Sequence, residues 1–121
     1  MVYDDSQAWK DVSKHFPDMT IRYVFILRKG PTWSPEETPE IAALQDAHLA
    51  NFRRLEDMGK LVVNGPFLDS FATNGEVRGM GVLRAGSIEE AKELISTDPM
   101  VKANRLVFEL HAWMVTKSIL T

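Results

Sequence analysis

Two spacings of hydrophobic residues alternate along this chain. Apolar side chains at every second position are typical of strands, whereas apolar side chains three or four positions apart lie on one face of a helix. The first pattern predicts strands in four segments: residues 20–28, 61–68, 76–84 and 106–116. The second predicts helices at residues 4–16, 41–59 and 87–96, with a short turn of helix at 99–103.

These elements follow the order strand, helix, strand, strand, helix, strand after an N-terminal helix. Right-handed crossovers turn that order into an α+β, ferredoxin-like domain, with a four-stranded antiparallel sheet and both helices on one face. We predict an N-terminal helical extension at residues 1–18 and one ferredoxin-like domain at 19–121. Asn74-Gly75 predicts a hairpin between the second and third strands. Gly65-Pro66 predicts that the second strand lies at an edge of the sheet or has a bulge at this point, and the bulge is preferred.

The sheet face without helices is predicted to be apolar as well. Its apolar residues are Val24, Ile26, Trp113 and Val115. A monomer would expose them as one large hydrophobic patch, which in soluble proteins commonly marks an interface. We therefore predict a homodimer in which two sheets meet face to face, with Glu109 and His111 as polar members of the interface.

One histidine interrupts the apolar stripe of the helix predicted at residues 41–59. His48 lies four residues after Leu44 and four before Phe52, so the three side chains point the same way. A histidine has an ordinary pKa of about 6.5, which suits a general base and acid near neutral pH. The alternative is a core histidine that fills space and bonds to one neighbour.

Several residues outside this helix are candidates for binding a substrate. Asn64 offers an amide, Gly65 and Pro66 would shape the edge of a pocket, and Trp33 could close over it from the polar loop at residues 29–39. Four strand arginines are expected mostly as solvated strand ends, and any one that points into the pocket would bind a carboxylate or phenolate. They are Arg22, Arg28, Arg78 and Arg84, of which Arg22 is taken as the candidate site residue.

Composition limits the class of protein. The chain has 121 residues, 45% of them hydrophobic and 26% charged, which suits one soluble domain. The net charge of -3 and the absence of a Lys/Arg run argue against nucleic-acid binding. Without cysteine there is no disulfide or thiolate chemistry. No segment reaches the ~20 apolar residues that span a membrane, and the acidic N-terminus is not a secretory signal. We expect a cytoplasmic protein.

Five segments together resemble a known family, the YciI-like (YCII-related) proteins. They are YVFILRKG, AHLANFRRLEDMGKL, VVNGPFLD, GSIEEAKELISTDPMVKANRLVFEL and the last strand. The most specific parts are the helix histidine followed by L-x-x-x-G, the later G-P, and the D-P after the second helix. The resemblance covers residues 20–117 and implies a dimeric α/β barrel of ferredoxin-like domains.

The resemblance also implies a histidine–aspartate active site, which corresponds here to His48 and Asp98. Asp98 precedes Pro99 and is also a typical helix N-cap. Because a capping carboxylate has a second oxygen, it could also orient the imidazole and stabilise its protonated form. Most of the family has no known function, although one branch dehydrochlorinates a chlorinated, hydroxylated aromatic and muconolactone-isomerase-like enzymes share the fold.

The leading hypothesis is a lyase or isomerase that needs neither cofactor nor metal and acts on a small cyclic or aromatic substrate. No HxxxH or HxH pair is present to support a metal site. A non-catalytic ligand-binding or regulatory homodimer is the main alternative, and a cofactor-free monooxygenase is a third possibility.

Overall fold

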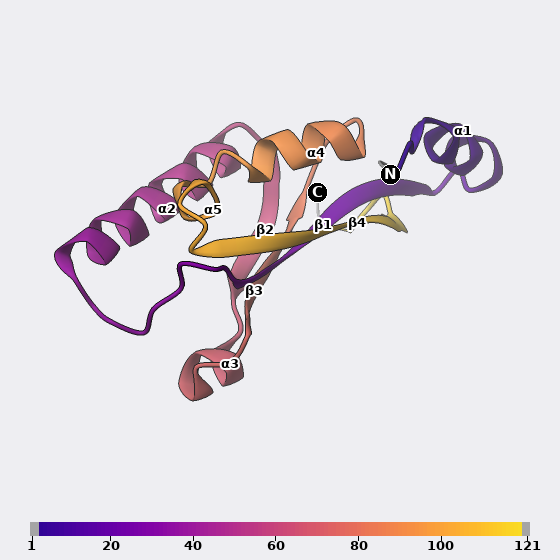
Figure 1. The fold of residues 1–121 in the computed structure, drawn as a ribbon. Helices are drawn as coiled ribbons and strands as arrows, with labels where there is room; N and C mark the ends of the chain where they lie inside the picture. Colours follow the sequence, from indigo (N-terminus) through magenta and orange to yellow (C-terminus); the bar gives the residue numbers. More distant parts are fainter. Residues whose placement is uncertain (1–2, 120–121) are drawn as a thin grey trace.

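The computed structural model describes residues 3–119, and its elements follow the predicted order with one addition. They are α1 (Ser6–His15), β1 (Met19–Lys29), α2 (Pro39–Asp57), β2 (Leu61–Pro66), α3 (Leu68–Thr73), β3 (Val77–Leu83), α4 (Ile88–Ile95), α5 (Pro99–Lys102) and β4 (Leu106–Thr116). The four strands form one antiparallel sheet in the order β2-β3-β1-β4. This is the predicted ferredoxin-like arrangement. Figure 1 shows α2, α4 and α5 together on one side of the sheet.

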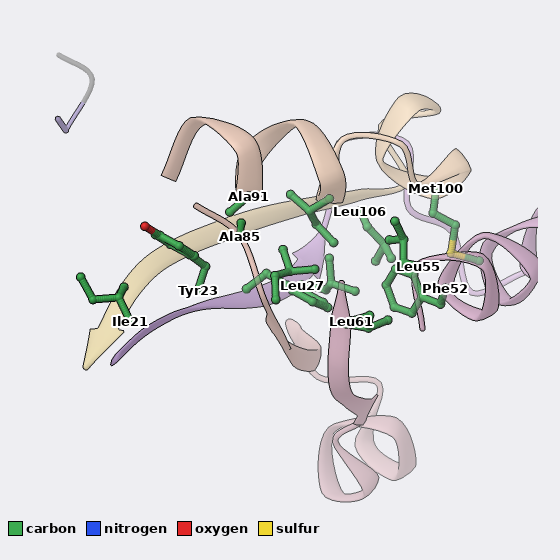
Figure 2. Close-up of a cluster of buried hydrophobic side chains, with 13 residues drawn as sticks. Ile21, Tyr23, Leu27, Phe52, Leu55, Leu61, Ala85, Ala91, Met100 and Leu106 are labelled. Carbon is green, nitrogen blue, oxygen red and sulfur yellow. The ribbon is translucent and has the colours of Figure 1, made fainter. Parts of the chain in front are cut away.

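The core lies between the sheet and these helices. Along β1, buried and partly exposed residues alternate, so that Ile21, Tyr23, Phe25 and Leu27 face the helices. Phe52 and Leu55 of α2 pack against this face, together with residues of α4 and α5, and Figure 2 shows the cluster. The alternation in the sequence therefore marks the face that was predicted to be covered.

The bounds of α2 follow from its end residues. The Thr38 hydroxyl accepts a hydrogen bond from the Ile41 amide at 3.2 Å, and Pro39 takes the first helical position, where its missing N–H costs nothing. At the other end Gly59 has a φ of 73°, and the Lys60 amide donates to the Leu55 carbonyl at 2.9 Å. A left-handed residue of this kind is the usual helix stop, and glycine enters the conformation at least cost.

The N-terminal helix α1 packs onto the same core. The Trp9 indole N–H donates to the Tyr23 hydroxyl at 2.8 Å, and that hydroxyl donates to the Asp5 carboxylate. Asp5, only 3% exposed, also accepts from the amide of Ile88 at the start of α4 at 2.9 Å. Ala8, Trp9 and Val12, which lie on the apolar side of this helix, pack against the core. Phe16 follows the helix and is 48% exposed.

Two local predictions were wrong. β2 and β3 are antiparallel neighbours as predicted, but Asn74-Gly75 does not form a tight turn between them, because α3 occupies the connection and Asn74 ends it at a φ of 57°. Figure 1 shows α3 standing away from the helical layer, where β2 and β3 meet. The second error concerns the bulge: β2 is an edge strand as predicted, but its register shifts between Leu61 and Val63 and not at Gly65-Pro66.

Candidate active site

His48 and Asp98 meet at the helical side of the sheet. The imidazole Nδ1 lies 2.8 Å from both Oδ1 and Oδ2 of Asp98. The Asp98 side chain is fully buried and the His48 side chain is 12% exposed. An ionised carboxylate only accepts hydrogen bonds, so Nδ1 carries the proton in this contact and Nε2 is left as the basic nitrogen. The contact that the sequence hypothesis required is present.

Asp98 is held by its place at the N-terminus of α5. Its Oδ1 accepts from the Met100 amide at 3.0 Å, which is the predicted N-cap. A second bond joins the same turn to α2: the Asn51 amide donates to the Thr97 hydroxyl at 3.0 Å, and that hydroxyl donates to the Leu94 carbonyl at 2.6 Å. Two hydrogen bonds, His48 to Asp98 and Asn51 to Thr97, thus join α2 to the 97–98 turn. Together they hold the imidazole against the carboxylate.

Two aromatic rings pack in sequence between the His48 imidazole and the sheet. The ring centroids of His48 and Phe52 are 4.4 Å apart, and Phe52 meets Phe25 of β1 edge-on at 5.7 Å. Phe25 in turn fills the space above Gly81, where an added Cβ would lie 2.3 Å from its ring. Phe25 therefore occupies the space above Gly81, and the rings of Phe25 and Phe52 support the His48 imidazole from the sheet side.

A cavity of about 710 Å³ opens beside His48, a size typical of sites for small organic molecules. Its apolar floor is formed by Leu27, Phe52, Met100 and Leu106. Other lining residues come from the 35–38 loop, from α2 between Ile41 and Phe52, from the end of β2, from the start of β3 and from α3. Of the residues predicted to bind substrate, Trp33, Asn64, Gly65 and Pro66 line this cavity. The Asn64 amide also donates to Glu56 at 2.9 Å.

Arg22 is not at the cavity. It lies on the other face of β1, with Val24, and one of its terminal nitrogens donates to the Ile21 carbonyl at 3.1 Å. Burial, and secondarily the nearby Arg84, lower the pKa of its guanidinium. The condition for Arg22 to bind a substrate, that it points into the pocket, is therefore not met at this cavity on the helical side.

Two other arginines lie at the cavity: Arg78 of β3 and Arg105, just before β4. Arg105 was not considered as a site residue, because no periodic pattern covers it; Asn104, at a φ of 59°, redirects the chain there. Backbone bonds from Gly30 to Arg105 and from Thr32 to Asn104, at 2.8 and 3.1 Å, then bring the Trp33 loop alongside. Glycine is required at position 30, since a Cβ would lie 2.2 Å from the Asn104 carbonyl oxygen.

Within residues 3–119, no three His, Asp or Glu side chains are grouped as a metal site would need. His111 pairs with Val24 and lies on the opposite face of the sheet from His48 and Asp98, so these three side chains do not converge. The same part of the chain contains no helix that is long and apolar enough to cross a membrane.

Known protein families and solved structures include proteins similar to this chain. The family model of the YCII-related domain matches residues 21–113. Among solved structures, the chain is similar to 5-chloro-2-hydroxyhydroquinone dehydrochlorinase (TftG) from Burkholderia phenoliruptrix AC1100 in complex with 2,5-dihydroxybenzoquinone. The identity is 23%, the TM-score 0.53, and the match covers 75% of this chain and 92% of that one. A search of curated proteins found no significant match. The family match spans most of the chain, which therefore belongs to the YCII-related domain family.

Proposed function

We propose that this protein is a cofactor-independent enzyme of the lyase or isomerase type, acting on a small cyclic or aromatic substrate. The observation that carries the proposal is the 2.8 Å contact between His48 Nδ1 and the buried Asp98 carboxylate, at the edge of a cavity of about 710 Å³. The similar dehydrochlorinase, whose structure holds a dihydroxylated quinone, supports a ring-sized substrate.

In the proposed mechanism His48 takes and returns one proton. With Nδ1 bound to Asp98, Nε2 accepts a proton from a ring hydroxyl or an activated C–H of the substrate. The Asp98 carboxylate balances the charge of the imidazolium and keeps its ring in place. Returning the proton to another substrate atom completes an isomerisation; loss of a leaving group after the first transfer completes an elimination.

The proposed working form is a homodimer joined through the sheet face without helices. Val63, Val107 and Trp113 on this face are 48%, 39% and 47% exposed in the single chain. Three large apolar side chains in this position support a partner surface, and a second copy of the same sheet offers a complementary one.

The test is His48→Gln, assayed on hydroxylated and halogenated aromatics and on lactones. Glutamine keeps a polar side chain but cannot act as a base, so we expect turnover of the best substrate to fall about 10²–10⁴-fold. His15→Gln, which changes an exposed histidine of α1, is the matched control and should leave turnover unchanged.

An undiminished rate in His48→Gln on a well-turned-over substrate would refute the catalytic role. A wild type that binds members of the panel without converting any of them would favour the alternative, a non-catalytic ligand-binding dimer. Oxygen consumption during turnover would point to a monooxygenase instead.

A further inference from the structure

Trp33 is surrounded by positive charge at the end of the cavity formed by β1, β3 and the start of β4. The distances from its ring centroid are 4.2 Å to Arg105 Cζ, 4.6 Å to Arg78 Cζ and 5.4 Å to Lys29 Nζ. None of the ion pairs between described residues involves these three cations. Among the described residues, no carboxylate is therefore paired with the positive charges of this cluster.

Two buried hydrogen-bond donors in this cluster have no acceptor among the described residues. They are Nε of Arg105, a residue only 8% exposed, and the indole Nε1 of Trp33. Both residues line the cavity. The great majority of buried hydrogen-bond donors in proteins are paired, and leaving a charged donor unpaired lowers the stability of the folded state. An acceptor group of a ligand in the cavity would pair with these two donors.

Arg78 is held in place by the backbone and by a second ring. Its Nη1 donates to the carbonyls of Ser70 and Gly75 at 3.2 and 3.1 Å, and its guanidinium lies 5.0 Å from the centroid of Phe71. Burial, and secondarily the charge of Arg105, lower the pKa of Arg78. Two neighbouring guanidinium groups repel each other, and an anion between them would relieve that repulsion.

We propose that Arg78, Arg105 and the Trp33 indole N–H bind an anionic oxygen group of a small cyclic ligand, either a carboxylate or a phenolate. This proposal rests on the proposed function only in that it places the ligand in the same cavity as His48. The ligand's ring lies over the apolar floor and its anionic group reaches the arginines. Glu36 and Glu37 also line the cavity, but both are exposed on the loop at its rim and are screened by solvent.

The test measures binding of charged and uncharged ligands of the same shape. Benzoate is compared with benzamide, and 4-nitrophenolate with nitrobenzene, by calorimetric titration at millimolar concentrations. For wild-type protein we expect the anion of at least one pair to bind about 10-fold tighter or more, as charge-assisted hydrogen bonds give. The pair that shows this preference identifies the group as carboxylate or phenolate.

Substitutions of the two arginines then test whether these residues cause the tighter binding of the anion. Arg105→Gln and Arg78→Gln should each reduce it to about 3-fold or less. Arg53→Gln removes the same charge from an exposed position of α2 and should retain it in full. If Arg105→Gln does not fold, as its melting curve would show, the Arg78→Gln result decides. Equal binding within both pairs in the wild type, or an anion preference that survives the substitutions, would overturn the proposal.

His48→Gln separates this site from catalysis. The substitution leaves the arginines untouched, so the anion preference should remain even if the variant or the wild type shows no turnover. The opposite result, turnover that depends on His48 without any anion preference, would leave the proposed function standing and reject the anion site.

Discussion

At the scale of single residues, the candidate site depends on one carboxylate with two tasks. Asp98 accepts from the Met100 amide as a helix cap and from His48 Nδ1 as an orienting partner, and it is fully buried. A cap alone would tolerate many polar side chains. The contact with His48 requires an acceptor that holds the proton on Nδ1, so the two tasks can be separated by substitution.

Asp98→Asn is expected to keep the cap and lose the base. The asparagine oxygen can still accept from Met100, whereas its NH₂ group donates to Nδ1 and moves the imidazole proton to Nε2. Turnover should fall about 10²–10⁴-fold. Asp98→Ala, which removes the cap as well, should in addition lower the free energy of unfolding by about 0.5–2 kcal/mol. Turnover assays with urea denaturation check both results, and wild-type turnover in Asp98→Asn would contradict the orienting role.

At the scale of secondary-structure elements, α1 is joined to β1 and α4 by a buried polar group. The chain of bonds runs from the Trp9 indole to the Tyr23 hydroxyl, then to the Asp5 carboxylate, which also accepts from the Ile88 amide. Tyr23 is 0% exposed. Residues 1–18 were predicted as a helical extension preceding the ferredoxin-like domain. This network predicts that α1 contributes to the stability of that domain's core.

The pH dependence of unfolding tests the role of Tyr23. Burial, followed by the hydrogen bond to Asp5, raises the pKa of its phenol well above its ordinary value of about 10. The hydroxyl therefore stays protonated in the folded protein where an unfolded chain would ionise. The stability that this gives is complete below pH ~10 and is lost as the pH rises above that value.

Tyr23→Phe should reduce the loss of stability above pH ~10 and lower the free energy of unfolding at pH 7. We expect about 1–3 kcal/mol less free energy of unfolding at pH 7, because Trp9 and Asp5 lose a buried partner. The decline of stability above pH ~10 should be smaller than in the wild type. Urea denaturation over this pH range measures both, with the 55%-exposed Tyr3 as the control in Tyr3→Phe. Identical slopes in Tyr23→Phe and wild type would show that Tyr23 ionises in the folded state.

At the scale of the whole molecule, the sheet has two different faces. Helices cover one, and the other carries Trp113 and the Arg28–Glu109 ion pair, with His111 Nε2 3.4 Å from Glu109. The Arg28 and His111 hydrogen bonds hold the pKa of the Glu109 carboxyl below its usual range. Glu109 and His111 thus contact each other within one chain, and their burial in a dimer interface stays a prediction.

Trp113→Lys tests the homodimer. A charged side chain among the exposed apolar residues of this face would be buried without a partner, so we expect the dimer dissociation constant to rise about 30-fold or more. Sedimentation equilibrium should then give a mass near the 13.7 kDa of one chain where the wild type gives twice that value. Met58→Lys, at a 52%-exposed position after α2, is the control. A monomeric wild type would refute the interface.

Much of the architecture could be predicted because it depends on local patterns. The alternation along β1, the Thr38-Pro39 start and the left-handed Gly59 stop each follow from a few neighbouring residues. Asn74-Gly75 misled the prediction because the dipeptide also suits a left-handed helix end, and α3 uses it in that way. The residue pair is a local signal, but the element that it terminates depends on contacts beyond it.

The sequence by itself determined the fold class, the helical stripe that contains His48 and the capping position of Asp98, because short-range spacing sets each of them. Only the tertiary structure decided which arginines reach the cavity. Arg22 shares a strand face with Val24 and points away, whereas Arg78 and Arg105 come together around Trp33 from three separate segments. Such convergence depends on strand register and on the turn at Asn104, neither of which has a periodic signature in the chain.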